Sequence, residues 1–93
     1  MYIYVLYNDA YGPEKYKIGC TNNLEENLMN HNKYYLKRSY YCHNVETEDN
    51  NLKKVIFVIL KKYKINDKDI FNVHIEQIKD AFKKAQEITN VFV

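Results

Sequence analysis

Glycine, proline, cysteine and tryptophan are scarce in this sequence, whose 93 residues include two glycines, one proline, two cysteines and no tryptophan. Cys20 and Cys42 are too few and too far apart to form a disulfide framework, so we expect both to be reduced thiols. The chain has no repeat, linker or low-complexity tract. With 46% hydrophobic residues it has enough apolar surface for one modest core, so we expect residues 1–93 to form a single domain.

Long apolar runs are also missing. No stretch approaches the roughly 18 residues that a membrane span needs, and the start of the chain does not combine a basic segment with a long apolar one. We therefore expect no membrane insertion and a location inside the cell, in the cytoplasm or nucleus of a host cell if the gene is viral.

Positive charge is in small excess, because 14 basic residues oppose 12 acidic ones and give a formal net charge of +2. Arg38 is the only arginine. This balance excludes a protein that is held on nucleic acid mainly by its total charge. Any contact with nucleic acid must depend on a local basic patch.

The N-terminal part of the chain predicts a β-hairpin. Residues 2–7 read YIYVLY, a run of β-branched and aromatic residues that favours a buried strand. The turn-forming residues of 8–14 separate this run from a second strand at 15–19. Asn22 and Glu25 then fit a capping box at the start of a helix, and the second half of residues 32–45 alternates enough to be a third strand.

Two more helices are predicted in the C-terminal half. Residues 55–60 could also be a buried strand, but the flanking lysines and the length of the apolar pattern favour a helix. The apolar positions that recur at helical spacing are Leu52, Val55, Ile56, Ile59 and Tyr63, and then Ile75, Ile78, Phe82, Ala85 and Ile88. The expected fold class is α+β: a small three-stranded antiparallel sheet flanked by about three helices, in the order β-β-α-β-α-α.

Two segments resemble the opening of the GIY-YIG endonuclease superfamily: YIYVL at 2–6 and YKIGCTNNLEENLMNHN at 16–32. The second segment is most similar to the T5orf172-like group of large DNA viruses and phages, and the resemblance continues more weakly through 52–65 and 70–73. It implies a sheet flanked by helices with a phosphodiester-cleaving site on its surface. In active members, two tyrosines lie near the attacking water, an arginine steadies the phosphate, a histidine or tyrosine assists, and a glutamate holds one divalent metal.

The motif residues of the strands and first helix are only partly kept in this chain. Tyr4 matches the first tyrosine, whereas Lys17 stands at the position of the second, and Tyr16 is shifted by one residue to the opposite strand face. His31 matches the assisting group, although a histidine at the edge of the core is an equally good interpretation. The remnant site implied by the resemblance comprises Tyr4, Tyr16, Lys17 and His31.

Two positions that matter most for cleavage are substituted. Asn27 stands where the arginine belongs, which removes a permanently charged bidentate phosphate donor. Lys53 follows Leu52 where the metal-binding glutamate belongs, and its ammonium repels a divalent cation by on the order of several kcal/mol. We therefore interpret the chain as a degenerate nuclease-like domain without metal or other cofactor, retained for binding nucleic acid or a protein partner, as a monomer or weak homodimer.

Tyrosines and basic residues interleave after the first helix and form the best candidate for contacting nucleic acid, because rings stack on bases while cations follow phosphates. A strand with a solvated basic face is the equal alternative. The candidate residues are Lys33, Tyr34, Tyr35, Lys37, Arg38, Tyr40 and Lys53. The cysteines and histidines lack the spacing of a zinc site, so we expect no metal centre.

Two other functions remain open. An active Mg²⁺- or Mn²⁺-dependent nuclease could use Glu46 or Glu48 as metal ligand and Arg38 or Lys17 as phosphate anchor. A viral protein-interaction module acting on a host factor is the second, and the low net charge and the apolar residues 91–93 favour it.

Overall fold

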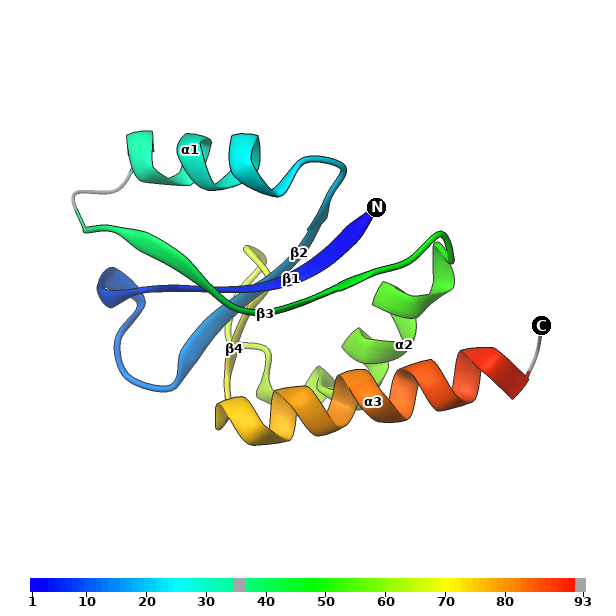
Figure 1. The fold of residues 1–93 in the computed structure, drawn as a ribbon. Coiled ribbons are helices and arrows are strands. Elements are labelled where there is room, and N and C mark those ends of the chain that lie inside the picture. Colours follow the sequence, from blue (N-terminus) through cyan, green and yellow to red (C-terminus); the bar gives the residue numbers. More distant parts are fainter. Residues whose placement is uncertain (35–36, 92–93) are drawn as a thin grey trace.

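The computed structural model describes residues 1–34 and 37–91 and has an α+β fold (Figure 1), which confirms the predicted class. Within these residues, no helix is both long and apolar enough to cross a membrane. The elements in chain order are β1 (Tyr2–Asn8), η1 (Asp9–Tyr11), β2 (Lys15–Thr21), α1 (Leu24–Tyr34), β3 (Ser39–Glu46), α2 (Asn51–Ile59), η2 (Lys61–Tyr63), β4 (Ile70–Asn72) and α3 (Ile75–Val91).

The strands form one antiparallel sheet in the order β3-β1-β2-β4. Strand β1 lies inside the sheet, and its Tyr4 pairs with Gly19 of β2 and with Asn44 of β3. The fourth strand, β4, adds to the three strands expected from the sequence. It is three residues long and pairs Phe71 with Tyr16.

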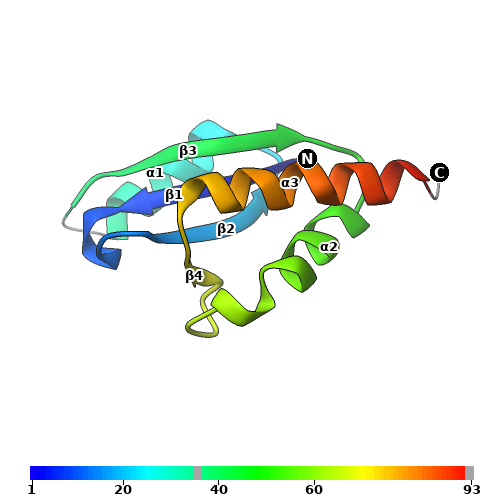
Figure 2. The same cartoon turned by 90° about the horizontal axis from the view of Figure 1, so that it is seen from below.

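The sheet separates two helical layers: α1 lies on one face, and α2 and α3 lie on the other (Figures 1 and 2). Because side chains alternate along a strand, Ile3, Val5 and Ile18 face α2 and α3. Tyr4 and Leu6 face α1. The buried core on the α2 and α3 side comprises Ile3, Val5, Ile18, Leu52, Ile56, Leu60, Phe71, Val73, Ile78, Ala81, Phe82 and Ala85.

Two helix boundaries differ from the expectation. The side chain of Asn23, not Asn22, caps α1, because its Oδ1 accepts from the backbone N–H of Glu26 at 3.0 Å. Residues 55–60 belong to α2 and the turn that follows it, not to a strand, but α2 ends at Ile59 and Tyr63 lies in the separate η2. A turn of 3-10 helix therefore redirects the chain toward β4.

Candidate functional site

The side chain of Tyr4 lies across the neighbouring strand β2 at Gly19, which has no side chain in its way. The side chain is 4% exposed, and a Cβ atom built on Gly19 would lie 2.5 Å from the Tyr4 hydroxyl oxygen and 2.7 Å from its Cζ. Tyr4 and Gly19 are register partners on β1 and β2, and the phenol occupies the space where a side chain at position 19 would lie. Its hydroxyl thus reaches past β1 across β2.

Asn27 and Tyr41 complete this side of the site. The Asn27 Nδ2 donates to the Tyr41 hydroxyl at 2.9 Å, and that hydroxyl donates to the backbone oxygen of Leu24 at 2.7 Å. The Tyr41 ring lies 5.4 Å from the Tyr4 ring, centroid to centroid. Burial raises the pKa of both phenols above its usual value, and a hydrogen bond with Asn27 opposes the rise in each case. Asn27 therefore orders two neutral tyrosines.

His31 and Lys17 lie on the same face as Tyr4. The His31 ring meets the Tyr4 ring edge-on at 6.4 Å. Burial lowers the pKa of His31, and the positive charge of Lys17 lowers it further. Tyr16 lies on the opposite face, where its ring is 5.6 Å from that of Tyr7. The structure thus brings Tyr4, Lys17 and His31 together with Asn27, and it places Tyr16 apart from them.

Lys53 borders an aromatic pocket of about 430 Å³ lined by Asn50, Lys53, Lys54 and Phe57. The Lys53 Nζ lies 5.1 Å from the centroid of the Phe57 ring, and the Lys64 Nζ lies 5.7 Å from the same centroid. Each distance fits a cation–π contact. Two ammonium groups therefore share one ring at the position where the resemblance implies a metal-binding carboxylate.

Asp69 connects this pair of lysines to Tyr4. Its carboxylate is 3.1 Å from the Lys64 Nζ, and its backbone oxygen accepts from the N–H of Ile18 at 3.1 Å. Burial is the main cause of the raised pKa of Tyr4, and the negative charge of Asp69 contributes in smaller part. Asp69 was not among the residues predicted from the sequence, and neither was Tyr41. Both come from segments far from the two motifs.

The remaining acidic candidates lie apart from one another. Glu46 pairs with Tyr2 and so faces the Tyr4 side of the sheet, whereas Glu48 lies exposed in the connection between β3 and α2. Among residues 1–34 and 37–91, no three His, Cys, Asp or Glu side chains are grouped so that they could hold a metal ion. Asp69, a carboxylate whose charge acts on Tyr4, is already paired with Lys64.

The predicted nucleic-acid segment divides between the two faces of the molecule. Lys33, Lys37 and Arg38 are exposed. Tyr40 is 52% exposed but packs on Tyr7, away from Tyr4. The side chain of Tyr34 and the whole of Tyr35 lie outside the residues that the structure describes.

The buried amide of Asn8 fixes where this segment enters β3. Its Nδ2 donates to the backbone oxygen of Lys37 at 2.6 Å and to the Ser39 hydroxyl at 2.9 Å. Its Oδ1 accepts from the backbone N–H of Ala10 at 2.8 Å. One side chain thus ties the basic residues before β3 to the hairpin end of the sheet.

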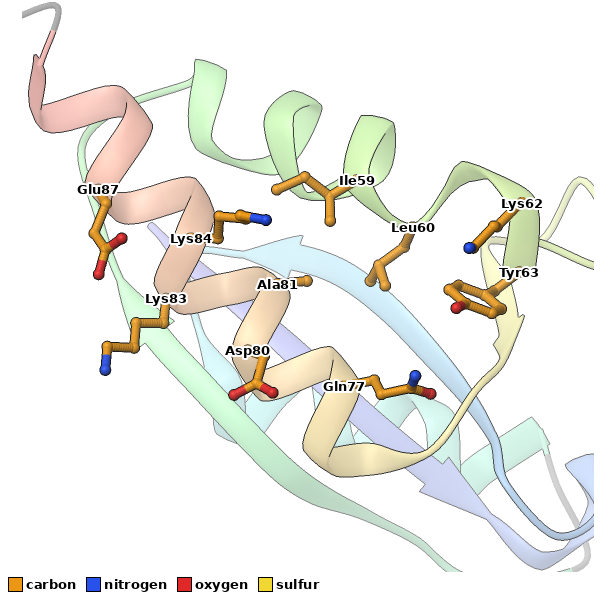
Figure 3. A pocket seen from close by; sticks show the side chains of 10 residues that line it. All are labelled: Ile59, Leu60, Lys62, Tyr63, Gln77, Asp80, Ala81, Lys83, Lys84 and Glu87. Atoms are coloured by element: carbon orange, nitrogen blue, oxygen red, sulfur yellow. The ribbon is translucent and has the colours of Figure 1, made fainter.

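A second pocket, of about 400 Å³, lies between α2, η2 and α3. Figure 3 shows Leu60 and Ala81 facing one another across it, with Lys62 and Lys84 toward its two ends. Asp80 and Glu87 also line it, so its charges are mixed. None of the residues predicted to form a site lines this pocket.

Mild acid is expected to destabilise the protein. Burial lowers the pKa of both His31 and His43. The positive charge of Lys17 lowers the pKa of His31 further, and the positive charge of Lys79 lowers the pKa of His43 further. Unfolding returns each pKa toward about 6.5, so the unfolded chain binds more protons as the pH falls below that value. The free energy of unfolding should decline from about pH 6.5 downward until both folded-state pKa values are passed. Urea unfolding at neutral and mildly acidic pH measures this, and a double variant with glutamine at both positions should show a flatter profile over that interval.

One family matches the chain. The T5orf172 domain matches residues 1–86, which include every element from β1 through most of α3. No curated protein and no solved structure matches the chain.

Proposed function

Because the chain belongs to the T5orf172 domain family, which is associated with endonucleases, we propose that it binds the phosphates of nucleic acid without cleaving them. The observation that carries this proposal is the position of Lys53, which lies with Lys64 on the Phe57 ring. Two cations therefore meet at the α2 position where the resemblance implies a carboxylate. A phosphate is attracted there by the same charges that repel a divalent metal.

The nearby carboxylate of Asp69 does not offset the repulsion between these lysines and a divalent metal. Asp69 is engaged at 3.1 Å by Lys64, and its backbone position is fixed by the bond to Ile18. A single carboxylate that already neutralises a lysine offers a divalent ion little net charge. We therefore expect no metal-assisted activation of water at this site.

The replacement of the expected arginine by Asn27 also favours binding without cleavage. An arginine at this position would offer a charged, forked donor to two phosphate oxygens. Asn27 instead uses its amide group to hold Tyr41. Lys17 supplies positive charge on this face of the sheet, where it acts on His31.

We expect labelled duplex DNA to bind the protein with an affinity that falls steeply as salt rises. Lys17→Ala and Lys53→Ala should each weaken binding and reduce the slope of log K against log salt by about one, since each removes about one phosphate contact. Lys83→Ala is the matched control, because Lys83 lies on α3 and lines the pocket between α2 and α3, not the pocket that Lys53 borders. Gel-shift titrations at several salt concentrations measure the slopes. Equal slopes for all four proteins would contradict the proposal.

Incubation with supercoiled plasmid and Mg²⁺ or Mn²⁺ tests the absence of cleavage. The competing function is a nuclease with relocated groups, which Glu46 favours because it faces the Tyr4 side of the sheet. We expect no nicking with either metal. Nicking that disappears in both His31→Ala and Glu46→Gln would establish the competing function instead.

A further inference from the structure

The pocket that Lys53 borders contains a partly exposed aromatic ring. Phe57 lines it together with Asn50, Lys53 and Lys54, and its volume is about 430 Å³. These four residues are three or four positions apart at and after the start of α2, so they share one side of the helix. They are named the lysine pocket. The pocket combines an aromatic surface with ammonium groups.

The Phe57 ring is held in place by the core. Phe71 is fully buried and meets it edge-on, with 5.1 Å between the ring centroids. Phe57 itself is only partly buried. A ring that is already fixed by a core residue loses little conformational freedom when a flat group stacks on it. The lysine pocket thus offers a preorganised aromatic surface to a ligand.

The lysines on this ring leave it available to a base. The Lys53 Nζ and the Lys64 Nζ lie 5.1 Å and 5.7 Å from the centroid of Phe57. A cation–π contact at an exposed site is weaker than the stacking of a base on an aromatic ring. Each ammonium is carried on a flexible four-carbon stem. It can therefore move from the ring to a phosphate when a base takes its place.

The charge around the lysine pocket is positive when all neighbouring groups along the chain are counted. Residues 48–69 include six lysines and four acidic residues. The lysines are Lys53, Lys54, Lys61, Lys62, Lys64 and Lys68, and the acids are Glu48, Asp49, Asp67 and Asp69. Asp69 is paired with Lys64 at 3.1 Å, and Asp49 accepts from the backbone N–H of Asn51 at 2.8 Å. The four residues that line the pocket include two lysines and no acid.

An unpaired base between two phosphates fits this combination. In a duplex the faces of the bases are covered by their neighbours, so a protein reaches only base edges and the backbone. In a single strand the face of a base can stack on an aromatic ring while lysines contact the adjacent phosphates. The ring of Phe57 therefore favours single-stranded over duplex nucleic acid.

We propose that the lysine pocket binds an unpaired base of single-stranded nucleic acid. Phe57 stacks on the base, and Lys53 and Lys54 contact the phosphates beside it. This inference rests on the proposed binding of phosphates, to which it adds the form of the nucleic acid. Phosphates alone bring any nucleic acid to the protein, and Phe57 selects the single strand.

Oligothymidine and an abasic oligonucleotide of the same length isolate the base, because they carry the same phosphates. Fluorescence anisotropy should give a Kd for oligothymidine that is about 5-fold to 150-fold lower, the range for one stacked base. The dependence on salt should be the same for both strands. Equal Kd values that depend on salt would overturn the base pocket and leave the phosphate proposal intact. Failure of both strands and of duplex DNA to bind would contradict both proposals.

Variants of the ring assign the effect to the lysine pocket. Phe57→Leu should raise the Kd for oligothymidine and leave that for the abasic strand unchanged, whereas Phe57→Tyr keeps the ring and should bind as the wild type does. Tyr63→Leu is the matched control: the Lys62 Nζ lies 5.1 Å from the Tyr63 centroid, but Tyr63 lines the other pocket (Figure 3), with Asp80 and Glu87. It should leave both Kd values unchanged. Circular dichroism verifies that each variant folds.

Two further ligands identify the source of the base and the competing partner. Oligodeoxyuridine and oligouridine differ only in the 2′-hydroxyl, so the tighter of the two shows whether DNA or RNA supplies the base. Phe57→Leu should weaken the binding of that strand. An equal loss for the abasic strand would overturn the proposal, because the ring would then act through the fold and not through a base. Polyglutamate that binds as tightly as oligothymidine would also overturn it, in favour of an acidic protein segment.

Discussion

Gly19→Ala should lower the free energy of unfolding by about 1–3 kcal/mol, the range for adding a methyl group to a packed site. The added Cβ would lie 2.5 Å from the hydroxyl oxygen of Tyr4 and 2.7 Å from its Cζ. The phenol cannot simply swing away, because it is buried against Tyr41 and His31. For a domain of this size each kcal/mol lowers the Tm by about 4–8 °C.

A competing effect acts in the opposite direction but is smaller. Replacing glycine by alanine restricts the unfolded chain and stabilises a protein by about 0.4–1 kcal/mol where the backbone permits it. Gly19 lies in extended backbone within β2, so alanine meets no backbone strain there. The steric conflict with Tyr4 therefore decides the sign.

A double-mutant cycle isolates the conflict. Tyr4→Leu removes the Cζ and hydroxyl atoms that the new methyl would meet, so Gly19→Ala in that background should cost little or become stabilising. Urea unfolding of the four proteins gives the coupling energy, which we expect at about 1–3 kcal/mol. A coupling near zero would show that the close approach of Tyr4 to β2 is not what requires glycine.

The elements that the sequence predicted are those with a local repeating pattern. The run of β-branched and aromatic residues at 2–7 and the helical spacing of Ile75, Ile78 and Phe82 each require only neighbours in the chain. β4 has three residues, too few for a period, and it forms because Phe71 is buried against residues distant in sequence. The helix cap was misplaced by one residue because Asn22 and Asn23 are chemically identical candidates.

The site was predictable to the extent that its residues belong to the two motifs. Tyr4, Lys17, Asn27 and His31 lie at fixed spacing along β1, β2 and α1, and period-two geometry already assigned Tyr16 to the other face. Tyr41 reaches the site through a register shift opposite Val5 and Leu6.

Asp69 reaches the site by a different route, through a left-handed backbone conformation with φ of 62°. A register shift and a left-handed residue are both settled by tertiary pairing. A pattern of residue types along the chain therefore does not reveal them.

Phe71→Ala should have the largest effect on stability, a loss of about 3–5 kcal/mol, because it leaves a cavity in place of a fully buried ring. The Phe71 ring meets the Phe57 ring edge-on at 5.1 Å, so it also supports the surface that Lys53 and Lys64 share. Thermal unfolding followed by circular dichroism should show a Tm lowered by on the order of 15 °C or more.

Phe57→Ala is the matched control, because Phe57 is only partly buried and its loss should cost clearly less. Both variants disturb the lysine pocket, but only Phe71→Ala removes the residue that anchors β4 to β2. A loss of less than about 1 kcal/mol for Phe71→Ala, well below the usual range for such a residue, would mean that β4 adds little to the fold. In that case the backbone pairing of Asp69 with Ile18, and not burial of Phe71, would have to hold Asp69 and Lys64 beside the site.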